Sequence, residues 1–114
     1  MAGVVIVLRC TLTEPRFVDE LKNETAFIGD EVEFKCELSV ADAAVTWKKD
    51  GRVIKHDRGK YVIHVWERDH VLFINDVNAA DAGQYSAVFN NNVTTTATLT
   101  VKGGLQYLLL FHSV

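Results

Sequence analysis

The sequence has 114 residues, of which 48% are hydrophobic and 24% are charged, with two cysteines and a formal net charge of −3. This length suits one domain with its own hydrophobic core, and the composition is that of a globular protein rather than a disordered one. A pI near 5.7 provides no general attraction to nucleic acid or anionic lipid. Two cysteines are too few for a small secreted scaffold built on disulfides.

Apolar segments stand near both ends of the chain. We interpret residues 2–8 as a β-prone lead-in; a signal peptide is the alternative, although no basic residue precedes the run. Residues 105–111 are far fewer than the roughly 20 needed to span a bilayer. We therefore expect an N-terminal extension over residues 1–14, a domain over residues 15–101, an apolar C-terminal tail over residues 102–114, and no membrane span.

The first part of the domain is predicted to form short strands. Arg16–Val18 and Ala26–Ile28 are separated by a polar turn at Asn23–Thr25. Hydrophobic alternation is clearest over Glu31–Leu38, where every second side chain is apolar and those between are charged. Such a two-residue period predicts a strand that packs on one face and meets water on the other.

Further strands follow at regular spacing. Val45–Lys48 is predicted to form a hairpin with Val53–Ile54, because Asp50-Gly51 between them favours a tight turn. The remaining predictions are a pair at Lys60–Val65 and Val71–Asn75 joined by Glu67–Asp69, then strands at Gly83–Asn90 and Val93–Val101 with a turn at Asn90–Asn92. Seven or more short strands with regular turns predict an all-β sandwich.

The stretch from Asp76 to Ala87 connects two of these strands. Asp81, Gly83 and Tyr85 occupy alternate positions in it. Upstream lies Cys36, and Trp47 follows it eleven positions later. With Leu72-Phe73-Ile74, these residues resemble the I set of immunoglobulin domains, whose fold is a Greek-key β-sandwich. The resemblance covers Pro15 to Val101.

The resemblance implies roles for particular residues. The Tyr85 hydroxyl should bond back to upstream backbone and fix a corner of the sandwich. Asp81 should meet a basic residue, Lys60 or Arg58, at the base. The implied structural core comprises Cys36, Trp47, Leu72, Ile74, Asp81, Gly83, Tyr85 and Ala87.

One position departs from the disulfide-bonded members of this family. Their second cysteine lies two residues after the corner tyrosine, where this chain has Ala87. We therefore expect no intradomain disulfide and a free Cys36 thiol, since Cys10 lies outside the predicted sandwich. Omitting this bond is easiest in a reducing compartment, which favours the cytoplasm.

The resemblance is strongest to intracellular domains of muscle proteins such as titin, obscurin and the myosin-binding proteins, on the segments 47–51 and 78–83. It implies a non-catalytic interaction or structural module of a cytoskeletal or sarcomeric scaffold. Its partners would be other proteins, either cytoskeletal or neighbouring immunoglobulin or fibronectin-type domains. The alternative is an extracellular adhesion or receptor domain, in which Asn23 and Asn92 would be glycosylated because each starts an Asn-X-Thr sequence. Residues 1–14 and 102–114 do not resemble the family, so a fragment or variant of a longer multidomain chain is one interpretation.

No residue pattern indicates catalysis, a metal or a cofactor. The four histidines are scattered without metal-ligand spacing, and no serine lies in a nucleophile-elbow sequence. No glycine-rich phosphate loop occurs, since Gly29, Gly51, Gly59 and Gly83 fit turns. We expect neither enzyme activity nor nucleic-acid binding.

Three surface features are candidates for partner binding. Strand alternation turns five largely apolar side chains outward from the two strands between residues 60 and 75: Val62, His64, Trp66, Val71 and Phe73. Exposed apolar patches commonly mark interfaces. In the alternative interpretation, Trp66 packs over the adjacent turn and a terminal segment covers Phe73.

The second candidate is a basic edge formed by Lys48, Lys49, Arg52 and Lys55, with a solvated mixed-charge surface as the alternative. The third is an edge strand, at Ala26–Ile28 and at Val93–Val101 or Val53–Ile54, which could pair with a partner or a second copy.

Overall fold

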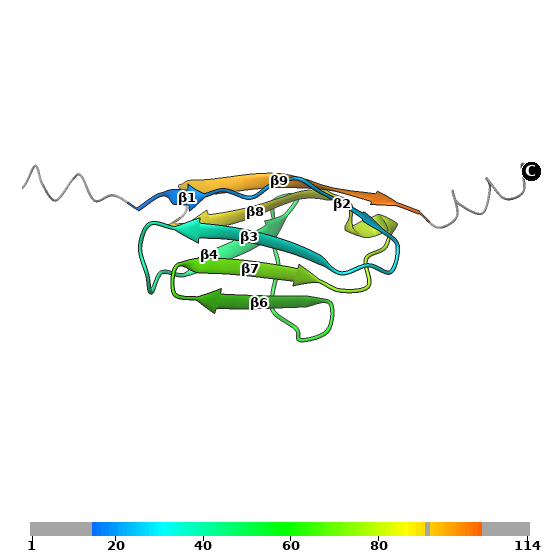
Figure 1. Ribbon diagram of the computed structural model, residues 1–114, viewed down its shortest axis with the longest axis horizontal. Helices are drawn as coiled ribbons and strands as arrows, with labels where there is room; N and C mark the ends of the chain where they lie inside the picture. Colours follow the sequence, from blue (N-terminus) through cyan, green and yellow to red (C-terminus); the bar gives the residue numbers. More distant parts are fainter. Residues whose placement is uncertain (1–14, 91, 104–114) are drawn as a thin grey trace, which may run out of the picture.

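Strands make up nearly all the regular structure. The computed structural model describes residues 15–90 and 92–103, and over these residues the chain forms two packed β-sheets (Figure 1). The expected extension at residues 1–14 and the tail from residue 104 lie outside this range. The predicted all-β sandwich is therefore confirmed over the described residues.

One sheet has four antiparallel strands. Its order across the sheet is β1 (Phe17–Asp19), β3 (Val32–Leu38), β7 (Asp69–Ile74) and β6 (Tyr61–Trp66). The registers pair Phe34 with Leu72 and Leu72 with Ile63, so these three side chains lie on one face. That face is the one that meets the core.

The second sheet has five strands and includes one parallel pair. Its order is β2 (Glu24–Phe27), β9 (Val93–Lys102), β8 (Gly83–Phe89), β4 (Val45–Lys49) and β5 (Arg52–Val53). β2 runs parallel to the last residues of β9, with Glu24 opposite Leu99 and Phe27 opposite Lys102. A single 3₁₀ turn, η1 (Ala79–Asp81), precedes β8.

The parallel pair corrects two predictions. Glu24 and Thr25 belong to β2 rather than to a turn, because the distant β9 supplies hydrogen-bonding partners that local sequence cannot show. Val93–Val101 is not an edge strand, since β9 lies between β2 and β8. The sheet edges are β2 and β5 in one sheet and β1 and β6 in the other.

The β6–β7 hairpin is tighter than the sequence indicates. Asp69 pairs with Trp66 and begins β7, so the turn contains only Glu67 and Arg68. The predicted Asp-Gly hairpin is confirmed: Lys49 pairs with Arg52, and Asp50 and Gly51 have φ angles of 49° and 86°. Both residues therefore adopt the left-handed backbone that a two-residue hairpin turn requires.

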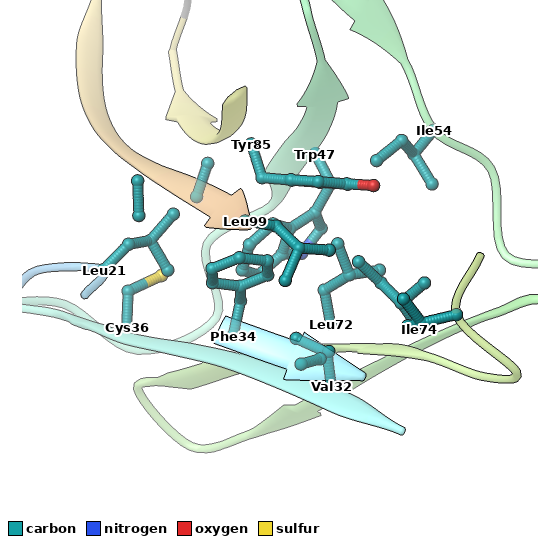
Figure 2. Close-up of a cluster of buried hydrophobic side chains, with 14 residues drawn as sticks. Leu21, Val32, Phe34, Cys36, Trp47, Ile54, Leu72, Ile74, Tyr85 and Leu99 are labelled. Carbon is teal, nitrogen blue, oxygen red and sulfur yellow. The ribbon is translucent and has the colours of Figure 1, made fainter. Parts of the chain in front are cut away.

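The core lies between the inner faces of the two sheets (Figure 2). Phe34 from β3 stacks on Tyr85 from β8 with ring centroids 5.2 Å apart, and Trp47 from β4 is 1% exposed. Burial of large side chains like these is the main source of folding free energy. These contacts join the two sheets into one unit.

Candidate interaction surface

The outer face of β6 and β7 carries all five residues of the predicted apolar patch. Val62 pairs with Phe73 and His64 pairs with Val71, so these four side chains form two adjacent cross-strand pairs. Trp66 follows at the end of β6 and pairs with Asp69. We call Val62, His64, Trp66, Val71 and Phe73 the β6–β7 patch.

Exposure varies within this patch. Trp66 is 67% exposed and His64 is also exposed, whereas Val62, Val71 and Phe73 are each partly buried. Trp66 therefore does not pack closely over the β6–β7 turn among the described residues. Whether a terminal segment covers Phe73 concerns residues outside the described range.

Charged residues of β3 border the patch on one side. Glu33 lies opposite Phe73 and Lys35 opposite Val71 across the β3–β7 pairing. Two ion pairs cross this border, Lys35 to Asp69 at 3.9 Å and Arg68 to Glu37 at 3.7 Å. An apolar centre with a charged rim is the arrangement found in protein interfaces.

On its other side the patch reaches the edge of the sheet at β6, where side chains of the preceding loop bond to backbone amides of the strand. Asp57 Oδ1 accepts a hydrogen bond from the Tyr61 amide at 2.9 Å, and His56 Nδ1 accepts one from the Ile63 amide at 3.0 Å. These backbone amides would otherwise be available for pairing with another strand.

The corner before β8 is held by several hydrogen bonds. The Tyr85 hydroxyl donates to the backbone oxygen of Asp81 at 2.6 Å, so the predicted tyrosine corner is confirmed. The Asp81 carboxylate is buried, accepts from Lys60 Nζ at 2.5 Å and from the Asn78 amide at 2.8 Å, and does not pair with Arg58. Burial raises the pKa of Tyr85, which keeps its hydroxyl a hydrogen-bond donor.

Gly83 is needed for a reason that its place in a turn does not reveal. Its φ is 149°, and a Cβ atom there would lie 2.7 Å from Asp50 Oδ2. Asp50 sits close because its Oδ1 accepts from the Gln84 amide at 3.0 Å. That bond, followed by the contact with Lys49, lowers the pKa of Asp50.

The sequence comparisons settle the family. The model of the immunoglobulin I-set domain matches residues 15–102. The chain belongs to the I-set immunoglobulin family.

Relatives of this I-set domain include muscle proteins. It is 37% identical over 83 residues to slow-type myosin-binding protein C of Homo sapiens, covering 72% of this chain and 7% of that protein. It is 29% identical over 87 residues to the cardiac-type protein of Gallus gallus, covering 75% of this chain and 7% of that protein. The chain thus spans a small part of these relatives.

A solved structure of titin domain I10 is also similar to this I-set domain, with a TM-score of 0.74 and 28% identity. The match covers 78% of this chain and 99% of that one. Agreement in both sequence and fold places the chain beside titin and myosin-binding protein C domains within the I set.

The I-set core position that lacks a second cysteine is filled by Ala87, which is fully buried, as is Cys36. Cys36 is a free thiol, and Cys10 lies outside the described residues. Burial raises the pKa of Cys36 to about 12, so at neutral pH the sulfur stays protonated and unreactive. Leu72 and Ile74 are also fully buried in this core.

The basic edge is divided between strand and hairpin. Lys48 and Lys49 lie in β4 and are partly buried, and Lys49 pairs with Asp50 at 3.1 Å. Arg52 and Lys55 are exposed on or next to β5, and neither makes an ion pair within the described residues. Among the four residues of the basic edge, Arg52 and Lys55 are therefore the two that are both exposed and without an ion pair in the part of the chain that the structure describes.

The two candidate glycosylation asparagines are both exposed. Asn23 precedes β2 and its Oδ1 accepts a hydrogen bond from the Thr98 amide at 2.8 Å. Asn92 precedes β9 in the turn between β8 and β9. Neither position distinguishes a secreted domain from a cytoplasmic one.

His70 is a buried residue that sequence reasoning missed. It is 1% exposed, lies opposite Cys36 in the β3–β7 register, and its Nε2 has no hydrogen-bond partner. Burial lowers the pKa of His70, partly offset by the Asp69 carboxylate. Its position two residues before Leu72 was the one available clue, because alternation puts both on the same face.

The described residues contain no group of three or more His, Cys, Asp or Glu side chains that could hold a metal ion. None of the helical structure in residues 15–90 and 92–103 is long and apolar enough to cross a membrane.

Proposed function

We propose that this I-set domain is a non-catalytic interaction and structural module of a sarcomeric scaffold protein, and that it acts in the cytoplasm. The kinship with myosin-binding protein C and titin domains supports this role. Cys36 is a free, buried thiol, and Ala87 occupies the position where disulfide-bonded members have their second cysteine. This supports a reducing compartment. A glycan on Asn23 or Asn92 in the protein isolated from its source would contradict the cytoplasmic location and favour the extracellular alternative.

The observation that carries the proposal is the β6–β7 patch. It places a tryptophan that is 67% exposed beside two cross-strand pairs, which contain three apolar side chains, and a charged rim. Tryptophan is enriched among residues that dominate binding energy, and a contiguous apolar surface favours association. We propose this patch as the partner-binding surface, and residues 15–101 as the unit that presents it.

The relatives suggest where to look for the partner. The name myosin-binding protein C indicates a myosin contact for that protein, and one similar structure is a complex of titin M10 with an obscurin-like 1 immunoglobulin domain, at 22% identity to this chain. A sarcomeric protein, either a filament component or another immunoglobulin domain, is therefore the class of partner that we propose.

Cosedimentation of the purified chain with washed myofibrils tests the proposal. We expect saturable binding that Phe73→Asp weakens about tenfold, because a buried carboxylate at the centre of an interface is strongly unfavourable. The matched control is Thr100→Asp, which adds the same charge at an exposed site on the other sheet. Equal binding by both variants, or no binding by the native chain, would refute the role.

Since Phe73 is partly buried, its substitution could also disturb the fold. Trp66→Ala is the second variant, and we expect it to change the free energy of unfolding by less than about 0.5 kcal/mol because most of the side chain meets water. Weaker myofibril binding by a Trp66→Ala protein of unchanged stability would assign the effect to the surface alone.

A further inference from the structure

A groove separates β5, an edge strand of one sheet, from the start of β6, an edge strand of the other. Its volume is 680 Å³, and its apolar lining comes from Val53, Ile54 and Tyr61. Val53 is 58% exposed, whereas Ile54 is buried and belongs to the core. The groove thus offers apolar surface to an incoming side chain without requiring the core to open.

Two carboxylates line this groove, but both are held by groups of the domain itself. Asp50 accepts from the Gln84 amide and from Lys49 Nζ. Asp57 Oδ1 accepts from the Gly59 and Tyr61 amides at 2.9 Å each, and these bonds lower its pKa. Hydrogen bonds of this kind stabilise the ionised carboxylates and orient their oxygen atoms toward the backbone amides.

The positive charges of the groove are less engaged. Lys49 is matched by Asp50 at 3.1 Å, but Arg52 and Lys55 also line the groove, are exposed, and form no ion pair within the described residues. The groove therefore carries an excess of positive charge beside its apolar lining, with three cations against the two carboxylates.

The backbone of β5 adds a third feature. β5 is the outer strand of the five-stranded sheet, and only β4 pairs with it. An edge strand presents backbone donors and acceptors to which an extended segment can bind. Arg52 and Lys55 lie within or next to this strand, so the charges and the free edge are continuous.

We infer that the groove between β5 and β6 binds an extended acidic segment of another protein, with one apolar side chain against Val53 and Ile54 and carboxylates on Arg52 and Lys55. This site rests on the proposed function only in requiring a protein partner, because it shares no residue with the β6–β7 patch. An acidic partner is favoured over a basic one because three cations, Lys49, Arg52 and Lys55, line the groove against two carboxylates, Asp50 and Asp57.

Nuclear magnetic resonance titration of the ¹⁵N-labelled chain with the synthetic peptide Glu-Glu-Leu-Glu-Glu tests this inference. We expect saturating amide shifts centred on Val53, Ile54 and Lys55, and weaker binding as ionic strength rises. Reversing both cations, with Arg52→Glu and Lys55→Glu together, should weaken binding about tenfold or more, since two favourable ion pairs become repulsive.

Controls separate this site from general charge attraction. Arg16→Glu with Lys22→Glu makes the same change in net charge at exposed positions away from the groove and should leave binding intact. Lys-Lys-Leu-Lys-Lys should produce no saturating shifts in the groove. Should the reversed variant lose its dispersed spectrum, Arg52→Gln with Lys55→Gln replaces it, with a smaller expected loss of affinity.

Three results would overturn the inference: no saturating shifts, equal weakening by the control variant, or shifts centred on Val71 and Phe73 instead. The last result would support the β6–β7 patch while rejecting the groove. Conversely, if Phe73→Asp did not weaken myofibril binding, the peptide titration would still test the groove. Each proposal can therefore fail without the other.

Discussion

The two ends of the sandwich differ in how completely their polar groups are bonded. At the end where β8 begins, Asp81 and Tyr85 are buried and hydrogen-bonded. The Asp50 carboxylate there accepts a hydrogen bond from the Gln84 amide. At the opposite end, the β6–β7 turn leaves Trp66 in water, and the nearby His70 keeps a buried Nε2 without a partner. Figure 1 shows these ends at the right and left of the strands.

This difference indicates that the end where β8 begins contributes more to the stability of the fold than the end with the β6–β7 turn. Buried polar networks that are fully bonded hold a structure in a single arrangement, because any alternative leaves a group unpaired. The exposed ion pairs beside the β6–β7 turn contribute little to stability. Substitutions at the β8 end should therefore affect folding, and those around the β6–β7 turn should affect folding less.

The largest effect should come from Gly83→Ala. The new Cβ would lie 2.7 Å from Asp50 Oδ2 at a φ of 149°, so both a steric clash and backbone strain oppose it. We expect a loss of about 3 kcal/mol in the free energy of unfolding, measured by urea denaturation. Adding Asp50→Ala should recover the part due to the clash, and a Gly83→Ala protein as stable as the native one would contradict the account.

A smaller loss is expected from Tyr85→Phe. This change removes only the hydroxyl that donates to the Asp81 backbone oxygen at 2.6 Å, and leaves that buried oxygen without its partner. We expect a loss of about 1–3 kcal/mol, with the ring stacking on Phe34 unchanged. An unchanged urea midpoint would show that the corner hydrogen bond is not stabilising.

At the other end, His70 should make stability depend on pH. Because burial lowers its pKa below 6.5 in the folded protein, the unfolded chain binds more protons between the two values. Stability should therefore fall as pH drops below 6.5 and level off once the folded-state pKa is passed. Urea unfolding from pH 7.5 downward should show this slope, with the range set by the reference pKa of histidine.

Two variants assign that slope. His70→Leu fills the same buried position without a titrating group and should flatten the pH dependence above the range in which carboxylates titrate. His64→Gln, at an exposed site in the β6–β7 patch, should leave it intact. A slope that survives His70→Leu would show that another group is responsible.

Local sequence predicted those parts of the fold that depend on neighbouring residues. The alternation of Val32, Phe34 and Cys36 marked β3 because burial on one face is visible at a two-residue period. Asp50-Gly51 marked its hairpin because few residue pairs adopt left-handed backbone at two successive positions.

Features that depend on distant partners could not be predicted in the same way. Glu24 and Thr25 are polar and became strand residues only through pairing with β9, some 75 positions later. Gly83 resembles any turn glycine until Asp50 is seen to approach it. His70 stands beside a charged turn, where a histidine is ordinarily exposed, and only its register opposite Cys36 places it inside.

For the candidate surface, alternation correctly grouped the five residues of the β6–β7 patch on one face, but not how far each is exposed. Val62 and Phe73 pair with each other and are partly buried, whereas Trp66, which pairs with Asp69 at the end of β6, is 67% exposed. The groove between β5 and β6 could not be predicted at all, since its lining combines a hairpin with the start of a strand in the other sheet.

The parallel pairing of β2 with β9 also determines how the domain would respond to tension. The chain reaches β2 from one end of the sandwich and leaves β9 at the other, as Figure 1 shows. Pulling residues 15 and 103 apart would slide the two strands along one another. The force would then act at the same time on all the residue pairs from Glu24–Leu99 to Phe27–Lys102. Rupture would then require these pairs to break together rather than one after another. The rate of unfolding under load, rather than equilibrium stability, would set how long the domain survives under tension.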